Sequence, residues 1–177
     1  MVEVSIVIVT WNTKEITRQC IQSICNAQTK VSVEIIIVDN ASEDDTIETI
    51  RNDFPEVNLI ANDTNRGFAK ACNQGIRKAN GDYVLLLNSD TTMRDNVLDS
   101  AVKFMEQTPD AGAIGVQIRN PDGSIQPSCY NFPALHRAIF EKLLPNKILP
   151  QSLRKNLEGR IHSCDYDSVR ECDYVMG

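Results

Sequence analysis

The sequence has little histidine, no glycine in its first strand-to-helix turn and no long apolar run. Its two histidines and six cysteines include no Cys-x-x-Cys pair, which argues against a structural zinc site. No stretch approaches the roughly 20 apolar residues of a transmembrane helix. The chain starts with Met-Val-Glu-Val and has no basic segment before its first apolar run, so we expect no secretory signal. Reduced thiols then fit a cytoplasmic compartment. The sequence leaves open whether the protein meets the inner face of a membrane.

The charge balance is acidic. The chain has 177 residues, a net charge of -6 and 42% hydrophobic residues. This length and apolar content suffice for one globular domain with a substantial core. An acidic chain is a poor partner for phosphate backbones, so we expect no nucleic-acid ligand.

Apolar runs alternate with amphipathic stretches along the first 118 residues. We expect five strands, at residues 4–9, 33–38, 57–61, 84–87 and 113–118. Helices are expected between them, the first to about residue 28, the second before Pro55, the third at 68–79 and the fourth at 95–107. This alternation predicts an α/β fold with a doubly wound, mostly parallel open sheet and helices on both faces. The fourth run, four apolar residues long, is expected to be buried on both faces.

Two helix starts have cap signals. Asn12, with Glu15 three residues later, matches a capping box before the first helix. Ser42 with Asp45 gives a similar signal before the second helix. Cys20, Cys25 and Cys72 lie on apolar faces of expected helices and are interpreted as reduced core thiols.

Polar side chains follow several of the expected strands. In a parallel sheet the carboxyl ends of the strands lie at one edge, where open α/β sheets bind ligands. Asn88 and Asp90 offer the oxygen ligands that Mg²⁺ or Mn²⁺ prefers. A carboxylate at Asp39 can accept hydrogen bonds from the N–H groups of a base. The expected set at this edge is Thr10, Asn12, Asp39, Asn40, Asp63, Asn88 and Asp90.

Several enzyme classes do not fit. Residues 10–14 contain no glycine, which excludes a Gly-x-Gly-x-x-Gly dinucleotide turn and a P-loop. Neither a Gly-x-Ser-x-Gly elbow nor a His-Glu-x-x-His helix occurs. A receiver domain needs an acidic pair after the first strand, and a nucleotidyltransferase needs a glycine-rich basic loop there. The sequence has Thr10-Trp11-Asn12 instead.

Four segments resemble the inverting family 2 glycosyltransferases of the GT-A fold, and most closely the rhamnosyltransferase-like branch. The segments are SIVIVTWN at residues 5–12, VDNASED at 38–44, NRGFAKACNQG at 65–75 and GDYVLLLNSD at 81–90. They occur in the family's order, and the resemblance extends over about residues 4–133. It implies one GT-A catalytic domain over residues 1–177. Within it, 1–118 would bind the nucleotide sugar and 119–177 would begin the acceptor-binding part, with the domain incomplete at its carboxyl end.

The resemblance also implies roles for single residues. Thr10 and Asn12 would line the nucleotide pocket, with Asp39 on the base. Asn88 and Asp90 stand where the family has its Asp-x-Asp metal motif, with Asp90 as the direct ligand of Mg²⁺ or Mn²⁺.

Four further residues are assigned differently. Asn65, Gly67 and Asn73 would have a structural or sugar-proximal role. Trp11 is interpreted as a core aromatic residue, with packing near the base as the alternative.

The implied reaction moves a sugar from a nucleotide-diphosphate donor, a UDP- or dTDP-sugar, to an acceptor hydroxyl with inversion. The acceptor would be a glycan or a lipid-linked molecule in the synthesis of cell-surface polysaccharide or glycan. The family's catalytic base is expected downstream of residue 177, because none of Asp165, Asp167, Glu171 and Asp173 matches its acidic motif. The chain would then bind nucleotide and metal and transfer sugar poorly. A non-catalytic nucleotide-sugar-binding module is the alternative.

Beyond residue 118 the pattern is weaker. A helix is expected at 134–144, a loop or lid at 145–170 and the start of a strand at 172–176.

Overall fold

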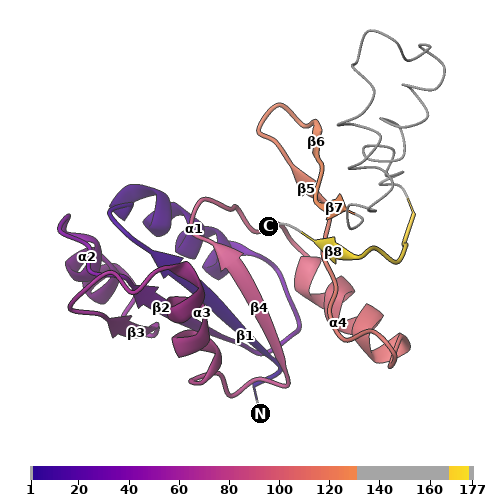
Figure 1. Cartoon of the computed structure of the whole chain (residues 1–177), viewed down its shortest axis with the longest axis horizontal. Helices are drawn as coiled ribbons and strands as arrows, with labels where there is room; N and C mark the ends of the chain where they lie inside the picture. The colour runs from indigo at the N-terminus through magenta and orange to yellow at the C-terminus, as the bar shows by residue number, and fades with distance from the viewer. Residues whose placement is uncertain (1, 131–167, 176–177) are drawn as a thin grey trace, which may run out of the picture. The chain divides into compact units, whose positions relative to one another are not determined.

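The computed structural model describes residues 2–130 and 168–175 of the chain (Figure 1). The chain separates into two compact units, Met1–Asp110 and Ala111–Gly177. The expected helix at 134–144 and most of the expected lid lie outside the described residues.

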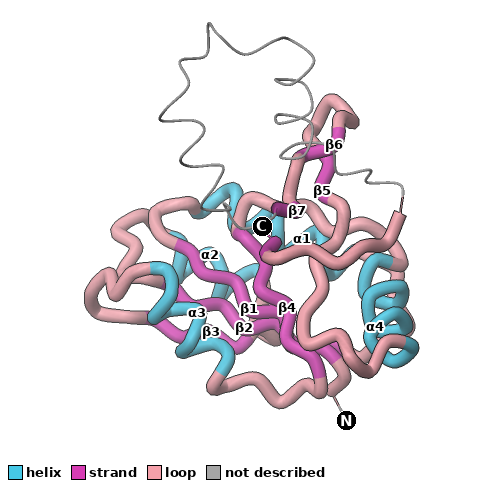
Figure 2. The backbone as a smooth tube through the Cα atoms, turned by 45° about the vertical axis from the view of Figure 1, so that its right-hand side comes forward, coloured by secondary structure: helices cyan, strands magenta, loops and turns pink. Residues whose placement is uncertain are grey.

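The first unit contains a four-stranded sheet in which every pair of neighbours is parallel. Its strands are β1 (Val4–Thr10), β2 (Val33–Asp39), β3 (Asn58–Ala61) and β4 (Tyr83–Asn88), in the order β3-β2-β1-β4 (Figure 2). Apolar, largely β-branched residues fill β1 and β2, as expected for strands in the middle of a parallel sheet. The predicted parallel α/β architecture is confirmed.

Helices cover both faces of this sheet. They are α1 (Lys14–Asn26), α2 (Thr46–Asp53), α3 (Phe68–Ile76) and α4 (Val97–Gln107). On one face, Ile6 and Ile8 of β1 belong to the same buried cluster as residues of α1, α2 and α4. On the other face α3 packs against β1 and β2. A Cβ on Gly75 of α3 would lie 2.3 Å from Cγ1 of Val7, so glycine is what lets this helix approach the sheet so closely.

The structure corrects the expected burial of β4. This strand is at the edge of the four-stranded sheet, and only alternate residues face the core. Leu85 and Leu87 pack against the buried cluster, whereas Val84 is 42% exposed and Leu86 is 50% exposed. An apolar run does not by itself show whether both faces of a strand are covered.

Both expected helix caps are also wrong. Asn12 has a positive φ of 52°, and α1 begins after Thr13 without a side-chain cap. Its first N–H, on Lys14, donates instead to Oδ2 of Asp44 at 3.0 Å. Likewise α2 begins after Asp45, and Ser42 makes no cap. Contacts between the loops after β1 and β2 replace the local caps.

Some apolar residues of the helices are exposed. Ile16 of α1 and Phe68 of α3 are 48% and 60% exposed. Cys25 is exposed, so its predicted core position is wrong, while Cys20 and Cys72 are buried free thiols as predicted. No helix among the described residues is long and apolar enough to cross a membrane.

Among its described residues, the second unit has two short antiparallel pairs of strands. β5 (Ile118–Arg119) pairs with β6 (Ile125–Gln126), and β7 (Cys129–Tyr130) pairs with β8 (Tyr174–Val175). The fifth strand predicted at 113–118 is therefore wrong: only its last residue is in a strand, in a hairpin closed by the turn at residues 120–124. β8 confirms the predicted start of a strand near the end of the chain.

Candidate functional site

The polar residues at the strand ends do meet at one edge of the sheet. Thr10 and Asp39 are register partners at the ends of β1 and β2, and Asn88 of β4 pairs with Val9. The backbone N–H of Asn62, directly after β3, donates to the backbone oxygen of Asp39 at 3.0 Å. We call the residues Thr10, Asn12, Asp39, Asn40, Asp63, Asn88 and Asp90 the strand-end ledge.

Asp39 is the most deeply buried carboxylate of the ledge, with 0% of its surface exposed. Its Oδ2 accepts a hydrogen bond from the N–H of Ser42 at 2.9 Å. Its Oδ1 is buried, and no group in the described part of the chain donates to it. Leaving a buried acceptor unpaired costs on the order of 1–3 kcal/mol. A ligand N–H is the kind of group that would satisfy this oxygen, once the atoms covering it move.

The loops after β1 and β2 clamp each other beside Asp39. The N–H of Asn12 donates to Oγ of Ser42 at 2.8 Å, and the N–H of Glu43 donates back to Oδ1 of Asn12 at 2.7 Å. Ala41 lies between Asn40 and Ser42 with a φ of 65°, in a region that non-glycine residues seldom adopt. The strained residue and the reciprocal bonds hold both loops in one conformation next to the buried carboxylate.

Asn40 holds the start of α3. Its Nδ2 donates to Oδ1 of Asn65 at 2.8 Å, and its Oδ1 accepts from the N–H of Arg66 at 2.8 Å. Oδ1 of Asn65 also accepts from the N–H of Gly67 at 2.9 Å, and Gly67 has a φ of 80°. With its amide occupied in this way, Asn40 positions the loop that the sequence assigned to the site.

The turn after β4 is supported by α1. Cys20 donates from its thiol to the backbone oxygen of Asn88 at 3.7 Å. The N–H of Thr91 donates to the same oxygen at 3.2 Å. One turn further along α1, Oγ of Ser23 accepts from the N–H of Met93 at 2.9 Å. These bonds fix the backbone on both sides of Asp90, whose side chain is exposed.

Burial raises the pKa of the Cys20 thiol from its ordinary value of 9.0 to about 11, and the neighbouring charge of Asp90 acts in the same direction. The thiol is therefore protonated near neutral pH and able to donate. It is a support for the turn and not a nucleophile.

The donor set at this turn suits a hard cation that is shared with a ligand. In the described part of the chain no three His, Cys, Asp or Glu side chains come together as a complete metal site. Asp90 alone supplies a carboxylate, and Asn88 an amide oxygen. Mg²⁺ is commonly held by one or two carboxylates together with substrate phosphates. The two oxygen donors of this turn therefore fit the cation when phosphate oxygens of a ligand complete its coordination.

Thr10 and its neighbour Trp11 differ in their exposure. The hydroxyl of Thr10 is buried and hydrogen-bonded to the hydroxyls of Thr13 and Thr17, at 3.0 Å and 2.7 Å. Thr10 thus ties β1 to α1. Trp11 is 54% exposed, so its interpretation as a core aromatic residue is wrong. Trp11 follows the last residue of β1 and precedes Asn12 in the chain.

Sequence reasoning missed Cys20, Ser23 and the N–H of Ser42 as supports of the site. Cys20 and Ser23 carry no motif that connects them to Asn88, 68 residues away in the case of Cys20. For Ser42 a signal exists, since it belongs to the segment that resembles the family.

Comparisons with known proteins agree with this geometry. The sequence profile described as "Glycosyl transferase family 2" matches residues 5–165. An N-acetylglucosaminyl-diphospho-decaprenol L-rhamnosyltransferase of Mycobacterium tuberculosis is 29% identical over 127 residues, which are 66% of this chain and 41% of that protein. The chain thus spans about two fifths of the length of this relative.

Solved structures show the same fold. S. aureus TarS 1-349 in complex with UDP-GlcNAc superposes with a TM-score of 0.62 at 21% identity, covering 74% of this chain and 38% of that one. Mannosyltransferase PcManGT from Pyrobaculum calidifontis, in complex with GDP-Man and Mn²⁺, superposes with a TM-score of 0.56 at 23% identity, covering 68% of this chain and 36% of that one. Because the profile spans most of the sequence and the parallel sheet is shared, the chain belongs to glycosyl transferase family 2.

Proposed function

We propose that the strand-end ledge binds a nucleotide-diphosphate sugar, a UDP- or dTDP-sugar, for transfer of the sugar to an acceptor hydroxyl with inversion. The observation that carries this proposal is the buried Oδ1 of Asp39, which no described group satisfies. A pyrimidine base presents an N–H donor that matches such an acceptor. The exposed indole of Trp11 offers a flat apolar surface nearby on which a base can stack.

Asp90 and Asn88, at the end of β4, would hold a divalent cation, Mg²⁺ or Mn²⁺. When bound, such a cation neutralises the charge that collects on a departing diphosphate. The observations in support are the oxygen donors of the two side chains and the fixed backbone around them. The Mn²⁺ complex of the mannosyltransferase with a similar fold supports the same assignment.

The chain's own residues supply binding and orientation in this scheme. Asp39 would fix the base, and the clamped loops carrying Asn12 and Ser42 would prevent the nucleoside from rotating. In an inverting transfer the acceptor oxygen forms its bond to the anomeric carbon as the bond to the diphosphate oxygen breaks. The acceptor hydroxyl gives its proton to a carboxylate base. We assign no residue of this chain to that base.

The acceptor is proposed to be a glycan or a lipid-linked molecule in the synthesis of cell-surface polysaccharide, at the cytoplasmic face of a membrane. This rests on the relative from Mycobacterium tuberculosis, whose name specifies a diphospho-decaprenol acceptor. We further propose that residues 1–177 bind donor but transfer sugar poorly. The alternative, a non-catalytic nucleotide-sugar-binding module, predicts that the protein retains no transfer activity in any context.

Thermal unfolding with UDP, dTDP and GDP, each with and without Mn²⁺, tests the proposal. A ligand at about 100 times its Kd stabilises the folded state by about 2.7 kcal/mol, which raises Tm by about 5–10 °C in a chain of this size. We expect this increase for UDP or dTDP with Mn²⁺ and a smaller one without it.

Variants then locate the ligand. Asp39→Asn retains an acceptor for the N–H of Ser42 but can present an N–H₂ donor where Oδ1 stands, so it should abolish the nucleotide shift. Asp90→Asn should abolish the Mn²⁺-dependent part. The control is Asp82→Asn, an exposed carboxylate directly before β4, at the end of that strand opposite the ledge. The proposal is wrong if Asp39→Asn binds nucleotide as tightly as the control does.

A further inference from the structure

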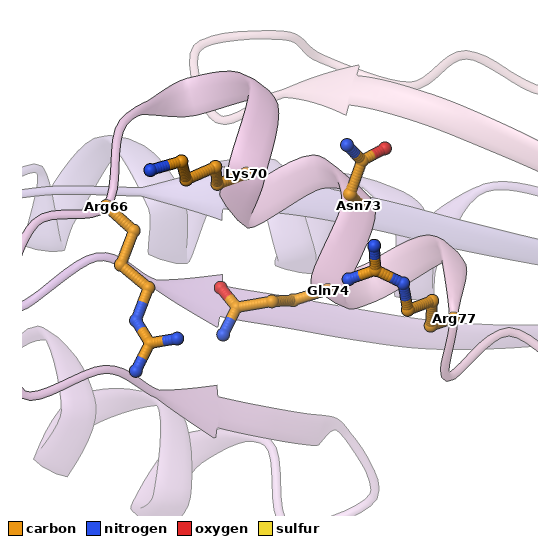
Figure 3. Close-up of a pocket in the computed structure, with 5 residues that line it drawn as sticks. All are labelled: Arg66, Lys70, Asn73, Gln74 and Arg77. Carbon is orange, nitrogen blue, oxygen red and sulfur yellow. The ribbon is translucent and has the colours of Figure 1, made fainter.

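A hollow of about 280 Å³ lies along the exposed side of α3 (Figure 3). Its lining consists of Arg66, Lys70, Asn73, Gln74 and Arg77, and three of these five side chains are cationic. None of the five belongs to the strand-end ledge. The volume is just below the range of about 300–1,000 Å³ that is typical of pockets for drug-sized ligands, so it suits a small ligand group.

These three cationic side chains line one hollow, although the net charge of the chain is -6. Elsewhere in the described residues, Lys14 and Arg18 form ion pairs with acidic neighbours at 3.1–3.7 Å. Arg66, Lys70 and Arg77 form no ion pair with any described residue, and no carboxylate lines the hollow. Like charges held close together without counter-charges favour the binding of an anion.

The spacing of these residues explains why they share one surface. Lys70 and Gln74 are four residues apart on α3, so they lie one helical turn apart on the same side of the helix, and Arg66 precedes the helix by two residues. Figure 3 shows the three side chains on the same side of the helix, with the guanidinium group of Arg77 close to the Gln74 end.

Parts of the hollow are fixed before any ligand arrives. Gln74 and Asn62 exchange two hydrogen bonds, from Nε2 to Oδ1 at 2.8 Å and from Nδ2 to Oε1 at 2.9 Å. At the other end, the N–H of Arg66 donates to Oδ1 of the buried Asn40 at 2.8 Å. The Gln74 side chain and the backbone at Arg66 are thereby tied to residues that follow β3 and β2, so the segment that carries the three cations is held in place.

We propose that this hollow binds a phosphate or diphosphate group at a second anion site, separate from the donor site. Arg66 and Arg77 can each give paired N–H donors to phosphate oxygens, and Lys70 adds a point charge. The phosphate can belong to a soluble molecule or to a lipid headgroup, since both present the same oxygens. The site requires neither a nucleotide base nor a divalent cation, so it does not depend on the proposed donor site.

Binding of inorganic pyrophosphate to the 177-residue chain tests the site, measured by calorimetry at constant ionic strength with EDTA present. EDTA removes divalent cations, so the ledge cannot use them. A second arm measures co-sedimentation with vesicles of phosphatidylglycerol and phosphatidylcholine, against phosphatidylcholine alone. The variant is Lys70→Glu combined with Arg77→Glu, and a milder one is Lys70→Gln combined with Arg77→Gln. The matched control is Lys103→Glu combined with Arg94→Glu, two exposed cations outside the hollow.

We expect the charge-reversal variant to bind at least about tenfold more weakly than wild type, since one charge-assisted hydrogen bond is worth a factor of that size. The affinity of the neutral variant should lie between those of wild type and the charge-reversal variant. The affinity of the control should stay within about twofold of that of wild type. Pyrophosphate binding identifies a soluble phosphate ligand, and binding to anionic vesicles alone identifies a headgroup. The site does not exist if neither probe binds wild type, or if the control loses as much binding as the variant. Loss of UDP binding in the Asp39→Asn variant leaves this result unchanged, so the two proposals fail separately.

Discussion

The thiol of Cys20, in the middle of α1, donates a hydrogen bond to the backbone oxygen of Asn88 at 3.7 Å. One turn later on the same helix, Ser23 accepts from the N–H of Met93. The helix α1, which packs on one face of the sheet, thus fixes the backbone before and after Asp90. The position of the proposed cation ligand depends on the first helix of the chain as well as on its own strand.

The Cys20 thiol gives a prediction for alkaline pH. Its pKa is raised from 9.0 to about 11 in the folded state, so the unfolded chain loses this proton first as the pH rises. The stability due to the neutral thiol is complete below pH 9 and is lost between about pH 9 and 11, by about 2–3 kcal/mol. Cys20→Ala should be less stable than wild type at pH 7 and should lose less stability above pH 9, as measured by urea unfolding at a series of pH values.

Cys25→Ala is the matched control for this measurement, since its thiol is exposed on the same helix. It should change the alkaline slope less than Cys20→Ala does. Parallel pH profiles for wild type and Cys20→Ala would show that the buried thiol does not titrate as argued.

Ser23→Ala tests whether α1 positions the turn after β4. The substitution leaves the N–H of Met93 without its acceptor at 2.9 Å, at a cost of about 1–3 kcal/mol. If Asp90 binds the cation as proposed, the Mn²⁺ concentration needed for half of the nucleotide-dependent Tm shift should rise several-fold. Ser100→Ala, at an exposed position of α4, should leave that concentration unchanged. An unchanged Mn²⁺ response in a destabilised Ser23→Ala protein would limit Ser23 to a structural role.

Asn40→Ala should be among the most destabilising changes at the ledge. Asn40 is 3% exposed, and its amide bonds both Asn65 and the N–H of Arg66. Because both bonds are partly buried and join two loops, we expect their loss to cost about 2–4 kcal/mol of stability and to give faster hydrogen exchange at the start of α3. Asn52→Ala, at an exposed position of α2, should cost less than about 0.5 kcal/mol. Equal effects of the two substitutions would exclude the positioning role of Asn40.

The ledge could be predicted from the sequence because its signals are local. The apolar runs of β1, β2 and β4 each stop at polar residues, and parallel strands bring their carboxyl ends to the same edge. Asp39 and Asn88 were therefore found without any knowledge of their neighbours. That they bind a nucleotide and a cation stays a prediction.

What the sequence could not show depends on residues far apart in the chain. Leu86 lies on the same face of the sheet as its register partner Val7, which packs against α3, and its exposure shows that α3 does not cover β4 as it covers β1 and β2; an apolar run looks the same in either case. Asn12 and Ser42 carry good local cap signals, but their hydrogen bonds go to each other's loop. A capping pattern describes only what a residue can bond nearby. Here hydrogen bonds between the two loops take the place of the local caps.

Gly75→Ala should separate the close approach of α3 from the helix propensity of the residue. Alanine is the better helix former by about 1 kcal/mol, but its Cβ would lie 2.3 Å from Cγ1 of Val7. Because the sheet must shift to accommodate it, we expect a net loss of about 1–3 kcal/mol by urea unfolding. Gly112→Ala is the control, since nothing lies within 4 Å of a Cβ there. A stabilised Gly75→Ala protein would show that the contact relaxes at no cost.

Glu34 should make the fold sensitive to acid. It accepts hydrogen bonds from Oγ of Ser5 and from the N–H of Asn80, both at 2.6 Å, at the edge of the sheet opposite the ledge. Burial alone raises the pKa of Glu34, but these bonds outweigh it and hold the pKa below 4.5. The contribution of the ionised group is therefore complete above pH 4.5 and is lost as the pH falls through the lower folded value.

Glu34→Gln keeps the shape of the side chain and removes its charge. We expect it to cost about 1–2 kcal/mol at pH 7, the difference between a charge-assisted and a neutral hydrogen bond, and progressively less as the pH falls below 4.5. Urea unfolding at pH 7, 5, 4 and 3 measures this convergence with wild type. Glu43→Gln, an exposed carboxylate whose side chain makes no contact with Ser5 or Asn80, serves as the control and should follow wild type throughout. A deficit of the same size at pH 3 as at pH 7 would mean that the lost stability comes from packing and not from the ionised carboxylate.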